Sequence, residues 1–301
     1  MSDIGLFPSD KQPPIGLVCP NGCGRIVFDK ASLHCPICRE DFPIINGIPL
    51  LFTNELRKKY QFGTGTAQSY YRKVPNEYDK THSVTKRGAQ LFIKELENKL
   101  SQYLTNEQSV LEIGSGTGFA TACIFSLNER MVITDASLEM LSINHARHPD
   151  ISVVCSPSEV LPFPEGSFDV IFGNNSFYLV ANKDQSAQRI SDILIDEGRL
   201  IISEMNPFHL LWPLRFMLSG RWFESGIYEI FPYQMKIRFK KYGMKLETVE
   251  FYSFYPYFAS ERFTWIFRFI EQSFGKINFF RRFLAFRVFY VLTKEKNATL
   301  G

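Results

Sequence analysis

The 301-residue sequence lacks several features that would assign a protein to a class directly. No stretch reaches the roughly 18 uncharged apolar residues of a spanning helix, and the N-terminus has no basic segment followed by an apolar run. The net charge is only +3, too small to indicate nucleic acid or an anionic membrane as the partner. No internal repeat is present. These absences lead us to expect a cytoplasmic globular protein.

Cysteine is scarce, and its six copies are unevenly distributed. Cys123 and Cys155 stand alone in apolar surroundings, which is typical of core packing. The other four form two pairs separated by eleven residues, each in a short turn: Cys19, Cys23, Cys35 and Cys38. Four thiolates suit a tetrahedral zinc ion in a closed, structural site, and unconnected buried thiols are the alternative. Residues 1–53 are therefore interpreted as a zinc ribbon, because so small a segment needs a metal to hold it together.

The rest of the chain alternates short apolar runs with helix-length segments. The runs at 109–113, 131–134, 151–155, 168–172 and 200–203 predict strands, and the segments at 87–104, 117–125, 137–147 and 183–194 predict helices. This alternation is typical of βαβ units around a parallel sheet. With a helix at 234–242 and strands at 244–252 and 286–293, we expect an α/β fold. It should be a Rossmann-like, seven-stranded, mostly parallel sheet with helices on both faces. Residues 54–108 are expected to hold a linker and N-terminal helices, and 109–301 the main domain.

The first predicted strand leads into a glycine-rich turn with the sequence VLEIGSGTGF. Gly114, Gly116 and Gly118 allow a sharp bend and a close approach of ligand to backbone. The third glycine comes one residue too early for the dinucleotide fingerprint, and Glu112 would repel a pyrophosphate but suits an ammonium group. Asp135 ends the next strand, where its carboxylate can accept hydrogen bonds from both ribose hydroxyls, or can instead cap a helix. The pattern favours a nucleoside that carries an ammonium group, such as S-adenosylmethionine.

Residues 78–206 resemble the class I methyltransferases that include ubiquinone and menaquinone methylases. The resemblance rests on the glycine turn, on Asp135, on the segment SPSEVLPF and on the strand FDVI. It implies S-adenosylmethionine as the cofactor and a set of cofactor-binding residues: Tyr78, Glu112, Gly114, Ser115, Gly116, Gly118, Asp135, Ala136, Met140, Ser158 and Asn174. One position departs from the family, because Pro157 stands where an aspartate usually holds the adenine amino group. Ser156, Ser158 or the backbone is left for that task.

The segment DFPIINGIPLL, at residues 41–51, resembles the end of the zinc-ribbon activator subunit of eukaryotic tRNA and rRNA methyltransferases. The resemblance implies an activator fused in cis, whose task is to stabilise the catalytic domain. It names no protein partner.

Candidate catalytic residues are sparse. The segment after the fourth strand, GNNSF, lacks the Asn-Pro-Pro-Tyr motif of methylases that act on DNA amines, and neither Cys123 nor Cys155 is placed to attack a pyrimidine carbon. Nucleic acid is therefore not favoured as the substrate. His209 follows the fifth strand, at the sheet edge where open α/β folds bind ligands, and is the candidate general base. Tyr178 is a weaker candidate, and a histidine without a chemical role is the alternative.

The C-terminal part is unusually aromatic, with 17 aromatic residues between 251 and 290. Helical spacing places Phe263, Ile266, Phe267, Ile270 and Phe274 on one face, and Trp265 and Phe269 on another. One face can pack on the core, and the other can cap a hydrophobic acceptor or touch a membrane surface. Extension of the core is the alternative. We expect substrate-cap elements at 205–233 and 255–285, with Leu210 and Leu211 in a facing apolar wall.

The leading hypothesis is in-line methyl transfer from S-adenosylmethionine to a hydrophobic small-molecule or lipid-like acceptor, with peripheral membrane contact through the aromatic insertion. A second hypothesis is an rRNA or tRNA methyltransferase that uses the zinc ribbon to bind substrate or partner. A third is a non-catalytic scaffold with the methyltransferase fold, which Pro157 keeps open.

Overall fold

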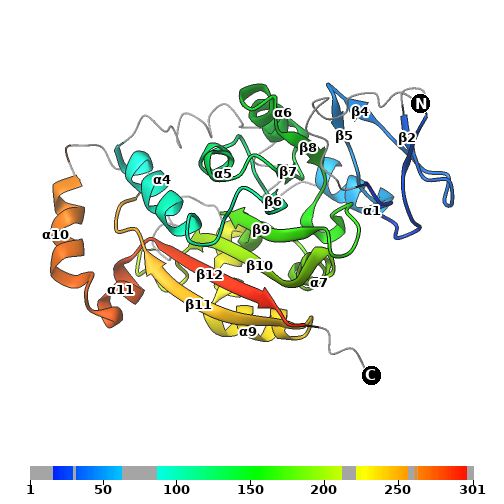
Figure 1. Ribbon diagram of the computed structural model, residues 1–301. Coiled ribbons are helices and arrows are strands. Elements are labelled where there is room, and N and C mark those ends of the chain that lie inside the picture. Colours follow the sequence, from blue (N-terminus) through cyan, green and yellow to red (C-terminus); the bar gives the residue numbers. More distant parts are fainter. Residues whose placement is uncertain are drawn as a thin grey trace.

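The computed structural model describes residues 16–29, 32–62, 87–211, 222–256, 262 and 264–296. Its main body is an α/β sandwich in which one large sheet has helices on both faces (Figure 1). The strands of this sheet are β6 (Val110–Ile113), β7 (Met131–Asp135), β8 (Ser152–Cys155), β9 (Phe168–Asn174), β10 (Leu194–Met205), β11 (Met244–Tyr252) and β12 (Arg287–Lys294). The helices around it are α4 (Arg87–Leu100), α5 (Thr121–Leu127), α6 (Leu138–Arg147), α7 (Lys183–Ile193) and α9 (Pro232–Lys240).

The strand order is β11-β12-β10-β9-β6-β7-β8, and within this described sheet only β12 runs antiparallel to its neighbours. The predicted seven-stranded, mostly parallel α/β fold is therefore confirmed. Strands β6 and β8 are buried along their whole length, as expected for parallel strands covered on both faces. Two apolar clusters fill the space between the sheet and its helical layers.

Three element boundaries differ from the sequence-based expectation by four residues or more. Helix α5 begins at Thr121 rather than at 117, because Gly118 takes a positive φ of 92° that no right-handed helix contains. Helix α4 ends at Leu100 rather than at 104. Strand β10 begins six residues early, at Leu194, across an irregularity in its pairing with β9.

The N-terminal segment forms two small antiparallel sheets. One contains β1 (Val27–Asp29), β2 (Ser32–His34) and β3 (Asp41–Phe42), and the other β4 (Ile44–Ile45) and β5 (Ile48–Pro49). Asn46 and Gly47 join β4 to β5 with positive φ angles of 53° and 78°, the geometry of a tight hairpin turn. We refer to residues 16–52 as the ribbon. Helix α1 (Asn54–Arg57) and the single turn η1 (Lys58–Phe62) follow it.

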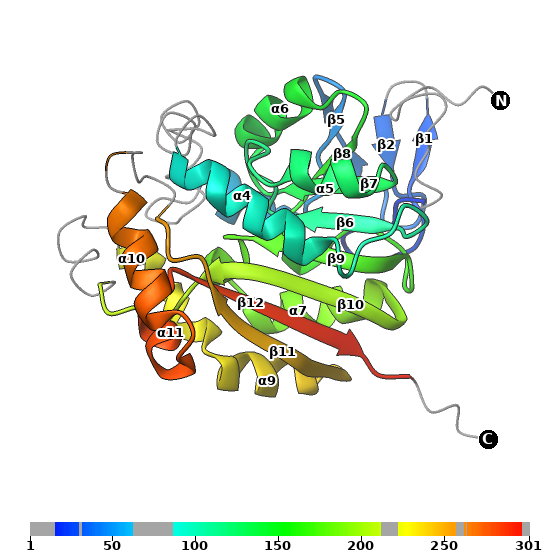
Figure 2. The ribbon, with the colours of Figure 1, turned by 60° about the vertical axis from the view of Figure 1, so that its left-hand side comes forward.

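The aromatic C-terminal insertion forms two helices, α10 (Thr264–Phe274) and α11 (Asn278–Leu284), before the last strand. Figures 1 and 2 show this helix pair at the end of the sheet opposite the ribbon. Shorter turns η2 (Ser158–Val160), η3 (Phe177–Leu179) and η4 (Trp222–Ile230) connect other elements. No helix in the described part of the chain is long and apolar enough to cross a membrane.

Candidate functional site

The glycine turn after β6 has the tight geometry that its sequence predicts. Gly114, Gly116 and Gly118 take φ angles of 62°, 55° and 92°, which favour glycine. A Cβ atom on Gly114 would lie 2.3 Å from the Cβ of Ser176, so the loop after β9 closes directly onto the turn. The Cβ of an alanine at Gly116 would instead contact the end of Met140, at 3.6 Å. Two neighbouring strand ends thus form a narrow cradle of exposed backbone.

Asp135 lies beside this cradle, at the end of β7. Its Oδ2 accepts the Gly116 N–H at 2.8 Å and its Oδ1 accepts the Ser137 N–H at 2.8 Å. The helix-cap alternative is not realised, because Ser137 is the residue whose side chain accepts the Met140 N–H and caps α6. Burial raises the pKa of Asp135, and the two N–H donors oppose that shift. Each oxygen retains a further lone pair, as two ribose hydroxyls would require.

Glu112 is fully buried in β6, next to the glycine turn. Its Oε2 accepts the Thr121 hydroxyl at 2.7 Å, and Asn144 in turn donates to that hydroxyl at 3.0 Å. Burial raises the pKa of Glu112 to about 8, in spite of the hydrogen bond from Thr121. A buried carboxyl of this kind favours a cationic ligand, because a nearby positive charge restores its ionised form.

Three buried hydroxyls around the cradle have no hydrogen-bond partner within the described part of the chain. They belong to Ser115 in the turn, Ser158 in η2 and Ser176 after β9. Buried polar groups are normally paired, so unpaired hydroxyls in one place indicate room for a polar ligand. The set of two carboxyl groups and three unpaired hydroxyls fits S-adenosylmethionine, which has an ammonium group, a carboxylate and a ribose.

The expected adenine side is formed by the segment after β8. Ser156 is buried and its hydroxyl donates to the Pro157 carbonyl at 3.3 Å, whereas the Ser158 hydroxyl is unpaired. Ser158 is therefore the better candidate to replace the missing aspartate. Met140 is buried against the glycine turn, as an adenine-packing residue would be, and Ala136 lies at the start of the same connection. Tyr78 falls outside the described residues.

The ribbon and the turn η1 that follows it contact this adenine-side segment at three points. The Leu51 N–H donates to the Cys155 carbonyl at 2.9 Å, and the Val18 N–H donates to the Pro162 carbonyl at 3.0 Å. Just after the ribbon, the hydroxyl of Tyr60 donates to Glu159 at 2.5 Å. Apolar side chains of the ribbon share a core cluster with the same segment: Leu17, Leu33, Phe42 and Leu51 with Leu161 and Phe163. The ribbon therefore supports one wall of the candidate cofactor site.

The four N-terminal cysteines converge as their spacing predicts. All four Sγ atoms lie within 4.8 Å of one another, and those of Cys19 and Cys38 are 3.7 Å apart. Sulfurs around a tetrahedral zinc ion at the usual bond length lie about 3.8 Å apart. Gly22, Gly24 and Arg39 take positive φ angles in the two knuckles, which turns the thiols toward one point. The thiol cluster has the composition and spacing for one structural zinc ion. Cys123 and Cys155, by contrast, are buried in the main core, as predicted.

The opposite side of the cradle contains charged residues that the sequence-based prediction did not include. In β10, Oε1 of Glu204 accepts the N–H groups of Ser176 and Phe177, at 3.0 and 2.7 Å. Arg287 at the start of β12 donates to Asn175, and its guanidinium lies 4.4 Å from the ring centre of Phe92. Burial raises the pKa of Glu204 to about 7, and the charge of Arg287 opposes the shift.

Asn174 is the candidate residue for the methionine end of the cofactor, and a hydrogen bond from β10 fixes its side chain. The Ser203 hydroxyl donates to its Oδ1 at 3.0 Å and is itself 2.6 Å from the hydroxyl of Tyr252. The antiparallel register of β12 places Arg287 opposite both Met205 and Tyr252, at the carboxyl edge of β10. The position of Glu204, an acid directly after the apolar run at 200–203, could have predicted it as a site residue. No comparable feature of the sequence marks Arg287 as a site residue.

His209 and Tyr178, the candidate catalytic residues, are both buried near this edge. The Leu211 N–H donates to Nδ1 of His209 at 3.3 Å, and the imidazole packs on Phe286 with ring centres 4.2 Å apart. Burial lowers the pKa of His209 to about 4, so the ring is neutral at pH 7. Because Nδ1 accepts a hydrogen bond, the proton is on Nε2, an arrangement that disfavours proton abstraction there. Catalysis by either residue stays a prediction.

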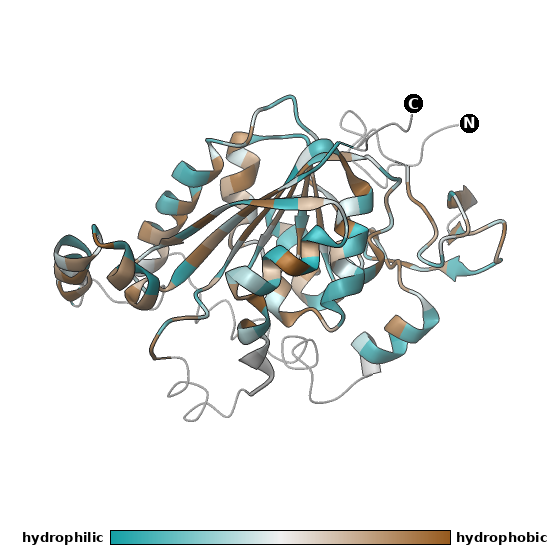
Figure 3. Ribbon diagram, turned by 90° about the horizontal axis from the view of Figure 1, so that it is seen from below, coloured by the Kyte–Doolittle hydropathy of each residue, from teal (hydrophilic) through white to brown (hydrophobic). Residues whose placement is uncertain are grey.

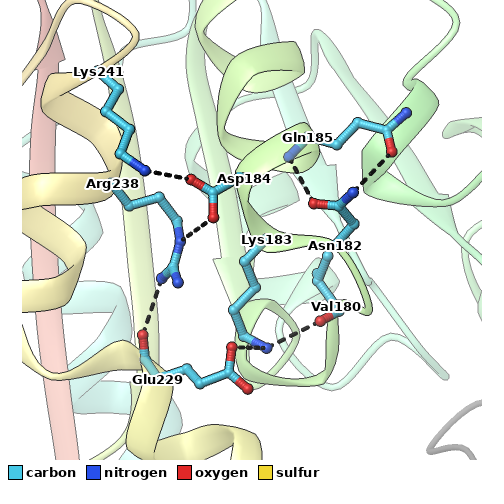
Figure 4. Close-up of polar contacts among 8 residues, drawn as sticks. All are labelled: Val180, Asn182, Lys183, Asp184, Gln185, Glu229, Arg238 and Lys241. Atoms are coloured by element: carbon cyan, nitrogen blue, oxygen red, sulfur yellow. Dashed lines mark hydrogen bonds and ion pairs between the residues drawn. The ribbon is translucent and has the colours of Figure 1, made fainter.

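Polar contacts connect the elements η4, α7 and α9, which follow Tyr178 in the chain. Lys183 at the start of α7 binds the Val180 carbonyl at 3.0 Å and the carboxylate of Glu229 at 3.2 Å (Figure 4). Asp184 pairs with Arg238 of α9 at 3.5 Å, and Arg238 also donates to the Glu229 carbonyl at 3.0 Å. Elements η4 and α9 are thereby tied to α7. Of the predicted apolar wall, Leu210 and Leu211 are exposed, and residues 212–221 lie outside the described part of the chain.

The segment that carries the cradle also matches a known family. Residues 111–202 match the sequence model of a family described as a methyltransferase domain. This part of the chain is thus similar to methyltransferase domains. The match begins in β6 and ends in β10, and thus covers the glycine turn, Asp135 and the segment after β8.

Relatives in sequence match about a third to a half of the chain. It is 34% identical over 99 residues to the biotin biosynthesis bifunctional protein BioHC of Cellvibrio japonicus, which is 33% of this chain and 20% of that protein. It is 31% identical over 107 residues to the ubiquinone/menaquinone biosynthesis C-methyltransferase UbiE of Hahella chejuensis, 33% of this chain and 43% of that protein. The chain thus spans less than half the length of these two relatives.

A solved structure has a similar fold. The S-adenosylmethionine-dependent methyltransferase of Thermotoga maritima superposes with a TM-score of 0.55 at 16% identity, over 76% of this chain and 99% of that chain. At this identity the likeness concerns the fold alone.

Proposed function

We propose that this chain transfers a methyl group from S-adenosylmethionine to a hydrophobic small-molecule or lipid-like acceptor. One observation carries the cofactor assignment. Glu112 and Asp135 stand near the ends of adjacent parallel strands, beside a glycine turn whose three glycines take positive φ angles. In this arrangement Glu112 would bind the ammonium group, Asp135 the ribose hydroxyls and Ser158 the adenine end.

The chemistry that S-adenosylmethionine supplies when bound is a methyl group on a positively charged sulfur, which leaves as a neutral thioether. The protein's contribution is to hold the acceptor in line with that bond and to exclude water, and positioning of this kind can supply most of the rate. Glu204 and Arg287 offset each other's charge beside the site. An acceptor that is already nucleophilic then needs no base from the chain.

The acceptor side favours an apolar molecule. Phe208, directly after β10, packs edge-on against three aromatic rings, those of Phe231, Phe251 and Phe283, with ring centres 4.7 to 6.3 Å apart. This aromatic wall continues the carboxyl edge of the sheet, where open α/β folds bind their ligands. It supports an acceptor with rings or acyl chains over a polar one.

The ribbon, in this proposal, binds one structural zinc ion and holds the adenine-side segment in place. Its hydrogen bonds to Cys155 and Pro162 stand on either side of Ser158 in the sequence. A closed site of four thiolates has no open position for chemistry, so the metal would act through folding.

Two measurements test the proposal in sequence. Calorimetry with S-adenosylhomocysteine should detect binding to the wild type and to Tyr233→Ala, an exposed control on α9, but little to Gly114→Arg or Asp135→Ala. Absence of binding to the wild type would overturn the cofactor assignment and favour the scaffold. Incubation with methyl-labelled cofactor and cell extract should then place the label in the organic fraction. Label confined to RNA would contradict the acceptor assignment and favour the RNA methyltransferase.

A further inference from the structure

The α10–α11 pair leaves its largest apolar side chains in solvent. Trp265 and Phe269 on α10 are 67% and 63% exposed, and Phe279 at the start of α11 is 67% exposed. Trp265, Arg268, Phe269 and Gln272 are all exposed and follow one another at helical spacing, so they form a continuous outer stripe on α10. Figure 3 shows hydrophobic turns on the helix pair at the left end of the molecule. We call this surface, with Ile277 and Phe280, the outer aromatic face.

The inner side of the pair is fixed to the domain, so the outer aromatic face cannot turn inward. Phe267 packs edge-on against Phe286 and Tyr255, with ring centres 6.2 and 6.5 Å apart. The hydroxyl of Tyr255 donates to Glu271 at 2.8 Å. Exposed aromatic side chains on a helix that is anchored by its other side indicate a surface that binds something outside the chain.

The charges on and beside the α10–α11 pair indicate which kind of partner the outer aromatic face binds. Arg262, Arg268, Lys276 and Arg282 are exposed, and between 262 and 284 the described residues include no exposed carboxylate. The one described acid there, Glu271, is partly buried and bound to Tyr255. A second copy of the chain would bring like charges together, whereas an anionic lipid surface would meet complementary ones.

The dimensions of α10 also suit a lipid surface. Its 11 residues span about 16 Å, too short to cross a bilayer but sufficient to lie in the plane of the headgroups. Tryptophan and phenylalanine on one face with arginine and lysine beside them are the composition of interfacial helices. We propose that the outer aromatic face docks the protein on anionic lipid bilayers.

Docking there would bring the carboxyl edge of the sheet close to the lipid, a consequence that rests on the proposed function. The amide of Asn206, which follows β10, donates to the carbonyls of Arg282 and Ala285 at 2.8 Å each. The guanidinium of Arg282 lies 3.8 Å from the ring centre of Phe208 in the aromatic wall. The helix pair is thus attached directly to the aromatic wall, so docking of its outer face would hold the acceptor side near the bilayer.

Co-sedimentation of the full chain with vesicles tests the docking directly. Vesicles of phosphatidylcholine mixed with phosphatidylglycerol should bind the wild type, and vesicles of phosphatidylcholine alone should bind it more weakly. The double variant Trp265→Ala/Phe269→Ala should lose roughly tenfold in partitioning for each aromatic removed. Arg268→Gln/Lys276→Gln should lose roughly fivefold per charge, on the anionic vesicles only. Tyr233→Ala, equally exposed on α9, should bind like the wild type.

Equal sedimentation of the wild type and the aromatic double variant, or no binding to anionic vesicles, would overturn the docking. A concentration-dependent dimer without lipid that the double variant loses would assign the face to a second copy instead. Calorimetry with S-adenosylhomocysteine on the same variants separates this result from the proposed function, because none of the substituted side chains contacts the glycine cradle.

Discussion

The ribbon and the α10–α11 pair lie at opposite ends of one sheet and differ in the burial of their large apolar side chains. The ribbon buries Leu33, Phe42 and Leu51 in the core of the main domain. Helix α11, in contrast, has no fully buried residue, and α10 exposes Trp265 and Phe269. A segment that buries its apolar side chains against a domain stabilises that domain. A segment that exposes them presents a surface for binding a partner.

The largest expected effect is loss of the metal from the ribbon. In Cys35→Ser/Cys38→Ser we expect no bound zinc, an unfolded ribbon and at least tenfold weaker cofactor binding, because a structural zinc site contributes about 10–16 kcal/mol to folding. Elemental analysis, limited proteolysis and calorimetry measure the three effects. Cys123→Ala is the control thiol and should keep both zinc and affinity. Unchanged cofactor affinity in the metal-free variant would show that the ribbon is not coupled to the site.

A second, smaller effect concerns apolar packing of the ribbon. Phe42 is fully buried among main-domain residues, so Phe42→Ala should lower the free energy of unfolding by about 3–5 kcal/mol. Denaturation by urea measures the change. A loss well below this range would mean that the ribbon rests on the domain without sharing its core.

The hydrogen bond between Tyr60 and Glu159 tests the link from the ribbon to the adenine side. Tyr60→Phe removes the hydroxyl that donates to Oε1 of Glu159, which keeps the longer hydrogen bond from the Asn182 N–H at 3.3 Å. The loss should cost about 1–3 kcal/mol. We expect a lower melting temperature and several-fold weaker binding of S-adenosylhomocysteine. Tyr103→Phe, at a half-buried tyrosine after α4 that packs on Phe289, is the control. A stability loss without any change in affinity would limit the ribbon to a structural role.

The pH dependence of cofactor binding tests the role of Glu112 in the cradle, which lies between the ribbon and the α10–α11 pair. Burial raises the pKa of Glu112 to about 8, so the free carboxyl is mostly protonated below that pH. A cationic ligand needs the ionised form. Its affinity should therefore fall by about tenfold, or 1.4 kcal/mol, per pH unit below pH 8 and level off above it. The ratio of wild-type to Glu112→Gln affinity cancels titration of the ligand itself. A ratio independent of pH between 6 and 8 would contradict the role of Glu112.

The smallest effect is expected at the outer aromatic face. Phe269→Ala removes a large side chain that contacts mainly solvent, so the free energy of unfolding should change by no more than about 0.5 kcal/mol. The same urea titration as for Phe42→Ala measures it. A loss comparable to that of Phe42→Ala would erase the contrast between the two segments and mean that the face is covered in solution.

The sequence predicted the parts of this molecule that depend on local pattern. Strands β6 to β9 follow from short apolar runs, the glycine turn follows from residue spacing, and the thiol cluster follows from two cysteine pairs. Each of these signals lies within a few neighbouring residues, where backbone geometry and burial act directly on the sequence.

The parts that escaped prediction depend on long-range register. Arg287 reaches the carboxyl edge only because β12 inserts antiparallel between β10 and β11, which no spacing near position 287 reveals. Tyr60 meets Glu159 across 99 positions of sequence. The two faces of α10 were visible as a pattern, but which of them faces solvent was settled only by the packing of Phe267.

The pairing of Leu50 with Cys155 also protects the sheet itself. Strand β8 is the last strand on its side, and an open strand edge is a template for pairing with other chains. The opposite edge strand, β11, bears the exposed charges of Lys245 and Glu247, which discourage such pairing. Strand β8 is fully buried and carries no such charges. Resistance to aggregation on that side therefore depends on a folded ribbon and, through the proposed zinc ion, on the supply of metal to the four thiols.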